Sequence, residues 1–208
     1  MKRIAFILLI IGFASCNQKN NSDKIEIYLL NKKIRSVEGI PLKDASKFKY
    51  IDSLTLSTYE SINYDTITNQ FIYGGKFDAK LSDLEKEPLI EDSEILFLDI
   101  EKSELEFTNS AFQKFLNFKK TNNNHKQFAI TVNKKPILTG YFRSKLTSYI
   151  FNYNYITFDE SITENEKIEN HPFKILYNDD FIKWKPKQIN LNKYPDLINA
   201  FEKTNRIK

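Results

Sequence analysis

The chain contains little cysteine, glycine and histidine for its length. Of its 208 residues, one is cysteine, five are glycine and two are histidine. A single cysteine cannot form a disulfide within the chain, so we expect a packed core to stabilise the fold. The sequence has no phosphate-binding glycine loop, no Gly-x-Ser-x-Gly elbow and no His-Glu-x-x-His pair. These absences exclude the enzyme classes that carry such signatures.

Metal-binding patterns are also missing from the sequence. A catalytic zinc normally takes three protein ligands, and His125 and His171 are far apart along the chain. The acidic segment 159–169 lacks the spacing of a calcium loop, and Asp179 and Asp180 form only a short acidic pair. We therefore predict no metal and no cofactor, and favour a non-catalytic protein over an enzyme. Paired catalytic carboxylates are defined by their separation in space, so a carboxylate hydrolase stays open as an alternative.

Neither the charge pattern nor the apolar runs point to nucleic acid or to a membrane-spanning helix. The formal net charge is +4, and basic and acidic residues are interspersed without a Lys/Arg block. The sequence therefore lacks the cluster of basic residues that is typical of nucleic-acid binding. The longest apolar run, residues 4–13, has about half the roughly 20 residues needed to cross a bilayer.

The first sixteen residues have the layout of an export signal. Lys2 and Arg3 follow the initial methionine and are basic, and residues 4–13 are apolar. The small residues Ala14 and Ser15 then precede Cys16. A basic start, a short apolar stretch and small residues at the cleavage site are typical of a secretory signal peptide. Lipidation would also explain the lone cysteine of an exported protein.

The segment Phe13-Ala14-Ser15-Cys16 resembles the lipobox of bacterial lipoproteins, with Phe13 where that family usually has leucine. The resemblance implies a signal peptide over residues 1–15 and a diacylglycerol on Cys16. Two or three acyl chains anchor a protein stably where one does not. We therefore predict a protein of the cell envelope, lipid-anchored to a bacterial membrane, on the periplasmic or surface face of the outer membrane. The polar residues 16–24 would form a flexible tether.

Residues 25–92 are predicted to be a β-rich N-terminal part. Strands are expected at residues 25–30, 54–61 and 64–73. Gly74-Gly75 favours a hairpin leading into a further strand at residues 76–81. The acidic stretch 82–92, interrupted by a proline, indicates a loop or a short helix.

Residues 93–208 are predicted to be an α+β lobe. Strands are expected at residues 95–100, with 104–107 as a continuation of that strand, and at 128–132, 136–142 and 149–158, with a tight turn at 133–135. A helix should run from Asn109 or Ser110 to about Lys120. Within it Phe112, Phe115 and Leu116 follow helical spacing and should face the sheet. The fold class is therefore α+β, with one domain or two small lobes.

The order of elements across residues 95–158 resembles the periplasmic head of the SecD protein-export subunit. The resemblance is carried by the segment 128–142, by the turn Asn133-Lys134-Lys135, and by Phe112 and Phe115 on the preceding helix. It covers about a third of the chain. It implies a ferredoxin-like lobe of βαββ order and implies nothing about motor function.

Four aromatic residues alternate along the last predicted strand and would share one face: Tyr149, Phe151, Tyr153 and Tyr155. They are either core residues under a helix or an exposed platform for a peptide, glycan or lipid. The core interpretation is the more common outcome for such a stripe.

Taken together, these features favour a non-catalytic binding or assembly module of the cell envelope. Its partner would be another envelope protein, or an extended peptide that pairs with a sheet edge. Two alternatives stay open: a hydrolase of envelope polymers, and an immunity-type lipoprotein that blocks a toxin at the envelope.

Overall fold

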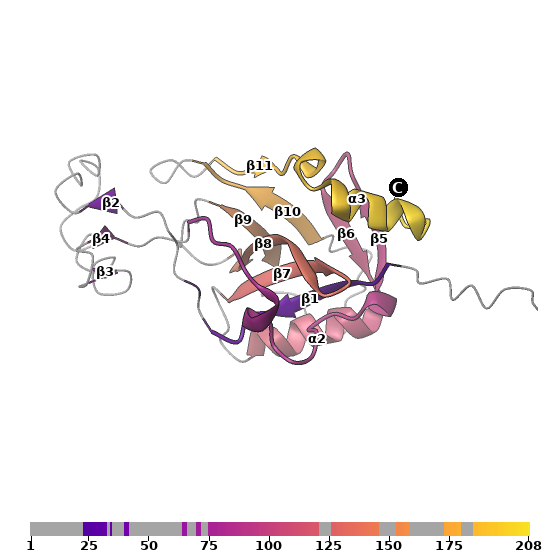
Figure 1. The fold of residues 1–208 in the computed structure, drawn as a ribbon, viewed down its shortest axis with the longest axis horizontal. Helices are drawn as coiled ribbons and strands as arrows, with labels where there is room; N and C mark the ends of the chain where they lie inside the picture. The colour runs from indigo at the N-terminus through magenta and orange to yellow at the C-terminus, as the bar shows by residue number, and fades with distance from the viewer. Residues whose placement is uncertain are drawn as a thin grey trace, which may run out of the picture.

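A computed structural model of the chain shows a sheet-rich α+β protein (Figure 1). The structure describes residues 23–32, 34, 40–41, 64–65, 70–71, 75–120, 126–145, 153–158, 173–179 and 185–208. Eight strands form the main sheet: β1 (Ile25–Leu29), β5 (Ile95–Asp99), β6 (Glu104–Phe107), β7 (Gln127–Val132), β8 (Lys135–Ser144), β9 (Asn154–Phe158), β10 (Phe173–Tyr177) and β11 (Lys187–Gln188). The helices are α2 (Asn109–Lys120) and α3 (Pro195–Lys203), with 3-10 turns η3 (Leu81–Asp83), η4 (Asp92–Glu94) and η6 (Leu191–Lys193).

The main sheet has the order β1-β7-β8-β9-β10-β6-β5, with β11 paired to β10. Of its described pairings, β8 with β9 is parallel and the others are antiparallel. Strand β1 pairs with β7 across the predicted division at residue 92. The first strand of the predicted N-terminal part therefore belongs to the same sheet as the strands of the predicted C-terminal lobe.

Several predicted elements are confirmed. The strand at residues 25–30 is β1, and the helix expected at 109–120 is α2. The strand expected at 95–100 is β5. Its continuation through 104–107 is wrong, because those residues form β6, a separate strand that pairs antiparallel with β5. The predicted turn joins β7 to β8 through Asn133 and Lys134, which have φ angles of 52° and 64°. A two-residue turn with positive φ at both positions matches the twist of the strands that it joins.

The hairpin expected at Gly74-Gly75 is wrong. Gly75 to Lys80 lie outside any strand and lead into η3. This segment is fixed by side-chain contacts and not by the backbone hydrogen bonds of a strand pair. The ring of Phe77 packs edge-on against Tyr141 and Tyr153, and the Phe77 carbonyl accepts a hydrogen bond from Thr139 Oγ1 at 3.0 Å.

The single strand expected at residues 64–73 is also wrong. The structure has two short strands there, β3 (Tyr64–Asp65) and β4 (Gln70–Phe71), which pair antiparallel with each other. The chain therefore reverses direction between them. Strand β4 also pairs with β2 (Ile40–Pro41), giving a small sheet of order β2-β4-β3. The strand expected at residues 54–61 lies outside the described residues.

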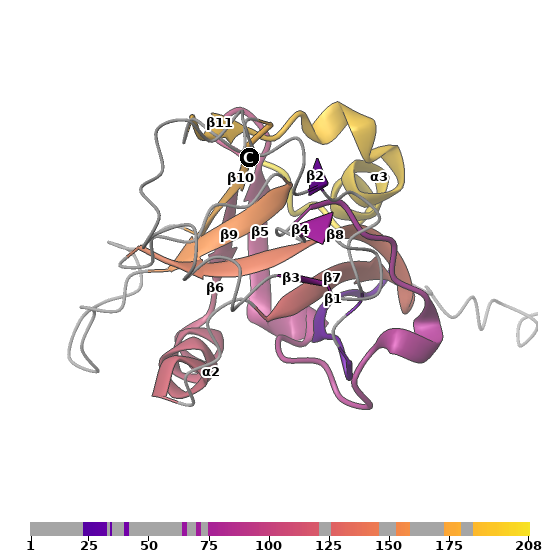
Figure 2. The ribbon, with the colours of Figure 1, turned by 90° about the vertical axis from the view of Figure 1, so that its left-hand side faces the viewer.

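Buried side chains form two clusters that pack against the main sheet. The larger cluster takes residues from seven strands of the sheet and from both helices. Figures 1 and 2 show α2 and α3 apart from each other, with strands between them. The smaller cluster contains the following buried residues: Tyr28, Leu30, Phe77, Leu84, Ala129, Tyr141, Tyr153 and Tyr155. Along β7, Ala129 belongs to the smaller cluster while its neighbours Phe128 and Ile130 belong to the larger one, so the clusters lie on opposite faces.

Other parts of the chain already bond to both edges of the main sheet. Ile27 of β1 exchanges backbone hydrogen bonds with Ile90, at 3.0 and 3.1 Å. At the opposite edge, Leu98 of β5 donates to the Arg206 carbonyl and accepts from the Lys208 amide. The Arg206 guanidinium secures this C-terminal segment with a 2.7 Å ion pair to Asp92. An extended partner would therefore have to displace part of this chain to pair with either edge.

Candidate functional site

The structure describes only part of the predicted site residues. Cys16, His125 and His171, and the aromatic residues Tyr149 and Phe151, lie outside the described residues. Asp180 and the acidic segment 159–169 also lie outside them, whereas Asp179 forms an exposed ion pair with Lys187 at 2.8 Å. Tyr153 and Tyr155 are buried, with exposed fractions of 9% and 0%. Neither of these two rings forms an exposed platform, yet Tyr153 also lines a cavity.

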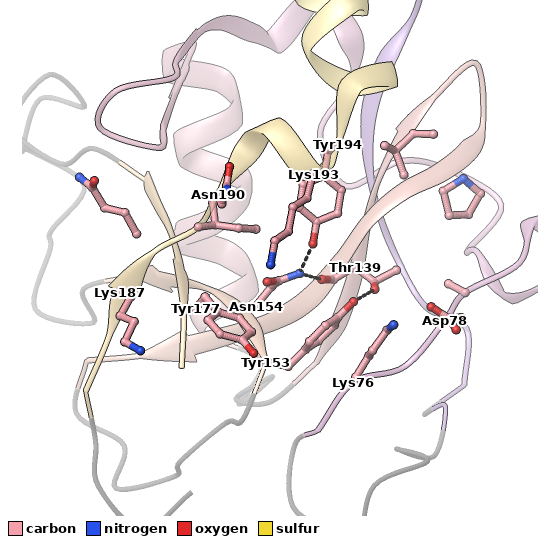
Figure 3. Close-up of a pocket in the computed structure, with 15 residues that line it drawn as sticks. Lys76, Asp78, Thr139, Tyr153, Asn154, Tyr177, Lys187, Asn190, Lys193 and Tyr194 are labelled. Atoms are coloured by element: carbon pink, nitrogen blue, oxygen red, sulfur yellow. Dashed lines mark hydrogen bonds between the residues drawn. The ribbon is translucent and has the colours of Figure 1, made fainter. Parts of the chain in front are cut away.

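A cavity of about 560 Å³ opens where β8, β9 and β10 meet η6 and the segment of residues 75–80 (Figure 3). Its volume lies in the range of small-molecule sites, about 300–1,000 Å³. Its lining is polar and aromatic, and it contains the following residues: Lys76, Asp78, Ala79, Pro136, Ile137, Thr139, Tyr153, Asn154, Tyr177, Lys187, Gln188, Ile189, Asn190, Lys193 and Tyr194. We call this cavity the Asn154 pocket.

The side chain of Asn154 is 2% exposed, and its orientation is fixed by its partners. Its amide nitrogen donates to the Thr139 carbonyl at 3.0 Å and to the Tyr194 hydroxyl at 2.9 Å. A carbonyl oxygen can only accept, so the nitrogen must face Thr139. The amide oxygen is thereby turned the other way and has no hydrogen-bond donor within the described part of the chain. In Figure 3 this oxygen faces the Tyr177 side of the cavity.

The hydroxyl groups beside Asn154 also have defined roles. Thr139 has one hydroxyl proton and donates it to the Phe77 carbonyl. In the 2.9 Å contact between Thr139 and Tyr153, the Tyr153 hydroxyl must therefore be the donor. The Tyr194 hydroxyl accepts from Asn154 and keeps its own proton free to donate. The polar wall of the pocket thus offers a donor at Tyr194 and acceptors at Asn154 and Tyr153.

The tyrosines of this wall are neutral at physiological pH. Burial raises the pKa of Tyr153 to about 12, and the hydrogen bond with Thr139 opposes that shift only in part. Burial also raises the pKa of Tyr194 above its ordinary value. A hydroxyl whose proton is held so tightly is a poor general base but a stable hydrogen-bond donor.

The charged groups at the pocket are mainly basic. Lys76, Lys187 and Lys193 line it, whereas Asp78 is its one lining carboxylate. Lys187 is paired with Asp179, but Lys76 and Lys193 have no ion-pair partner among the described residues. Figure 3 shows these two lysines entering from opposite sides, with the amino group of Lys193 directed toward Asn154. The pocket therefore favours a ligand that carries negative charge.

A second cavity of about 310 Å³ lies beside α3 and the turn between β7 and β8. Its charged residues pair with each other: Lys135 with Asp196 at 3.1 Å, and Lys203 with Asp23 at 3.2 Å. Because these charges neutralise each other, this cavity attracts a charged ligand less strongly than the Asn154 pocket does.

The lining of the Asn154 pocket contains a single carboxylate group, that of Asp78. Hydrolysis of the paired-carboxylate type needs two carboxyl groups, and the lining set offers no second one. In the part of the chain that the structure describes, no cluster of three or more His, Cys, Asp or Glu residues could hold a metal ion.

Sequence reasoning identified one residue of this pocket, Tyr153, and missed its polar centre. In the sequence Asn154 lies between two aromatic positions, and no site motif marks Tyr177, Lys193 or Tyr194. The available signal was weak: a tyrosine before a proline at the start of a helix, and an asparagine within an aromatic strand.

Comparison with known proteins gives no match: no family model, no curated protein and no solved structure is similar to this chain. The resemblances to lipoprotein signals and to the SecD head therefore stay predictions. Among the described residues, no helix has the length and apolar character needed to cross a membrane.

Proposed function

We propose that the chain is a lipid-anchored protein of the bacterial cell envelope whose folded body binds a ligand in the Asn154 pocket without catalysing a reaction. The observation that carries the binding role is the amide oxygen of Asn154. The side chain of Asn154 is buried, and its amide nitrogen already donates two hydrogen bonds. The amide oxygen therefore faces a cavity of ligand size. Convergent polar groups in a formed cavity favour a binding site.

The pocket is a better candidate for the binding site than either sheet edge. The outward backbone groups of Ile27 and Leu98 already bond to other parts of the chain. In the described structure the pocket, by contrast, offers the open amide oxygen of Asn154 and the free hydroxyl proton of Tyr194. It also offers two lysines that form no ion pair there. Another envelope protein or a peptide would be one source of the ligand, and nucleic acid would not, because the chain has no block of basic residues.

We also propose that residues 93–208 contain a ferredoxin-like βαββ lobe. The chain order β6, α2, β7, β8 supports this proposal. The sheet order departs from a simple four-stranded lobe, because β9 and β10 lie between β8 and β6 and β1 adds to the edge of β7.

The pocket can be tested by removing two tyrosine hydroxyls. Tyr177→Phe combined with Tyr194→Phe keeps both rings but deletes two polar groups that line the cavity. Full-length protein in detergent would be screened by thermal unfolding against envelope-derived glycans, peptides and lipids. We expect at least one class to raise the Tm of the wild type. The double variant should lose at least about tenfold in affinity, since each of the two lost ligand hydrogen bonds costs about 1 kcal/mol.

The control is Tyr28→Phe, which deletes a hydroxyl that bonds to Glu26, away from the pocket lining. It should bind like the wild type. If no class of compound raises the Tm, or if the double variant binds as well as the wild type, the pocket is not the binding site.

The anchor can be tested by replacing the predicted lipidation residue. Cys16→Ser should remove the acyl chains, so the protein should move to the soluble fraction or stay uncleaved. Cell fractionation and labelling with radioactive palmitate measure the two effects. Asn20→Ser, in the predicted tether, is the matched control and should stay labelled and membrane-bound. Wild-type protein that is soluble and unlabelled would disprove the lipid anchor.

A further inference from the structure

We infer that the Asn154 pocket takes a short saccharide that carries an anionic group, such as a uronic acid oligomer. This inference rests on the proposed function, because it names the ligand class of the same site. Three features of the pocket support it: its alternating donors and acceptors, its aromatic walls, and its uncompensated lysines.

The polar wall matches the hydroxyl groups of a sugar. Each sugar hydroxyl can donate one hydrogen bond and accept others, and neighbouring hydroxyls lie side by side on the ring. The wall presents the open acceptor of Asn154 next to the free proton of Tyr194, which is bonded to the same amide at 2.9 Å. A pair of adjacent hydroxyls satisfies both groups at once: one donates to the amide oxygen, and the other accepts from the tyrosine.

The aromatic walls match the rest of a sugar ring. Tyr177 and Tyr194 are only half-buried and line the cavity from β10 and from the end of η6. A sugar ring has an apolar face of C–H groups that packs against an aromatic ring, while its hydroxyls point outward to polar partners. A tyrosine offers both an apolar face and a polar end, so it serves both parts of such a ligand.

The lysines add the requirement for negative charge. The amino groups of Lys76 and Lys193 enter the cavity from opposite sides (Figure 3), and no ion pair neutralises them in the described structure. Asp78 is the one acidic group among the lining residues, so a neutral ligand would leave an excess of positive charge beside it. An anionic substituent on the sugar compensates that charge.

Two other ligand classes fit the pocket less well. A lipid tail would have to face Asn154, Thr139 and three lysines, which would cost the desolvation of these polar groups. Two common ways of binding a peptide are strand pairing and the burial of its apolar side chains in a groove. Strand pairing is blocked at Ile27 and Leu98, and the lining of the pocket is mixed rather than apolar.

Calorimetric titration of the full-length protein in detergent at low ionic strength tests the inference. The probes are short oligomers of galacturonate and of glucuronate, the matching neutral oligomers of galactose and of glucose, and citrate as an anion without a sugar ring. At least one uronate should bind, its neutral partner about tenfold more weakly, and citrate more weakly still. Added salt should reduce the affinity for the uronate more than that for the neutral sugar.

Matched variants separate the role of charge from that of the fold. Lys76→Gln with Lys193→Gln should lower uronate affinity about tenfold and leave binding of the neutral oligomer nearly unchanged. Lys86→Gln with Lys134→Gln removes two exposed charges outside the lining set and should bind like the wild type. Equal losses in both double variants would mean that the lysines act through overall charge, and would overturn the proposed site of recognition.

Failure of this inference is distinguishable from failure of the proposed function. If no saccharide binds, but a peptide or lipid of the screening panel does so and loses affinity in the Tyr177→Phe/Tyr194→Phe variant, the pocket is a binding site and the saccharide assignment is wrong. If citrate binds as tightly as the uronates, the pocket recognises charge alone and the assignment is also wrong. If nothing binds, both proposals fall.

Discussion

Replacing Phe115 with alanine is expected to reduce the free energy of unfolding by about 3–5 kcal/mol, enough to unfold much of the protein. Phe115 projects from α2 and is 4% exposed. Its ring stacks on Phe173 of β10 at 4.4 Å between centroids and also contacts Phe107 and Phe142, each at 5.5 Å. The truncation would leave a cavity where one helix meets three strands.

Urea denaturation followed by circular dichroism measures this loss as a lower midpoint. Gln113→Ala is the matched control, because Gln113 lies on the exposed side of the same helix. It removes a side chain of similar length and should change stability by less than about 0.5 kcal/mol. A Phe115→Ala protein that is nearly as stable as the Gln113→Ala protein would show that α2 does not contribute to the core.

The sequence predicted α2 correctly because the relevant signal is local. Phe112, Phe115 and Leu116 repeat at helical spacing, and all three are buried in the larger cluster. The turn at Asn133 and Lys134 was predictable for the same reason, since two residues that tolerate positive φ separate two strand-like runs. The helix and this turn could therefore be identified from residues that are close together in the sequence.

The order of strands in the sheet could not be predicted in this way. Strand β1 pairs with β7, and Ile25 lies opposite Val132 although more than a hundred residues separate them. No local pattern records such a pairing, because it depends on which apolar faces meet in the core. Phe77 illustrates the same limit: its segment resembles a strand, but its ring is fixed by Tyr141 and Tyr153 from distant parts of the chain.

The Asn154 pocket was unpredictable for a related reason. Its polar groups come from segments that are distant along the chain, among them Lys76, Thr139, Asn154 and Lys193. Each of these residues alone has a common structural explanation as an exposed lysine or a residue of a strand. Only the fold shows that the nitrogen of Asn154 is occupied and that its oxygen is turned into a cavity.

Gly140→Ala is expected to disturb the fold and this pocket together. Gly140 lies in β8, where a methyl group would come within 2.7 Å of the Asn154 carbonyl oxygen in β9 and 2.9 Å of the Phe128 ring. The first neighbour is backbone, which cannot rotate away, so β8 and β9 must move apart. Overpacking of this kind costs about 1–3 kcal/mol. Because the amide of Asn154 is held by the carbonyl of the adjacent Thr139, the same movement should also misplace the acceptor of the pocket.

Thermal unfolding and ligand titration should therefore report a joint loss in Gly140→Ala, a lower Tm and weaker binding. Ser82→Thr, which adds one methyl group to an exposed side chain, should change neither property. Tyr194→Phe separates the two effects, because it removes a partner of Asn154 while leaving the contact between β8 and β9 unchanged. It should weaken binding at a smaller cost in Tm. If Gly140→Ala binds ligand as tightly as the wild type, the position of Asn154 does not depend on the close approach of these two strands, and the pocket must be held by other contacts.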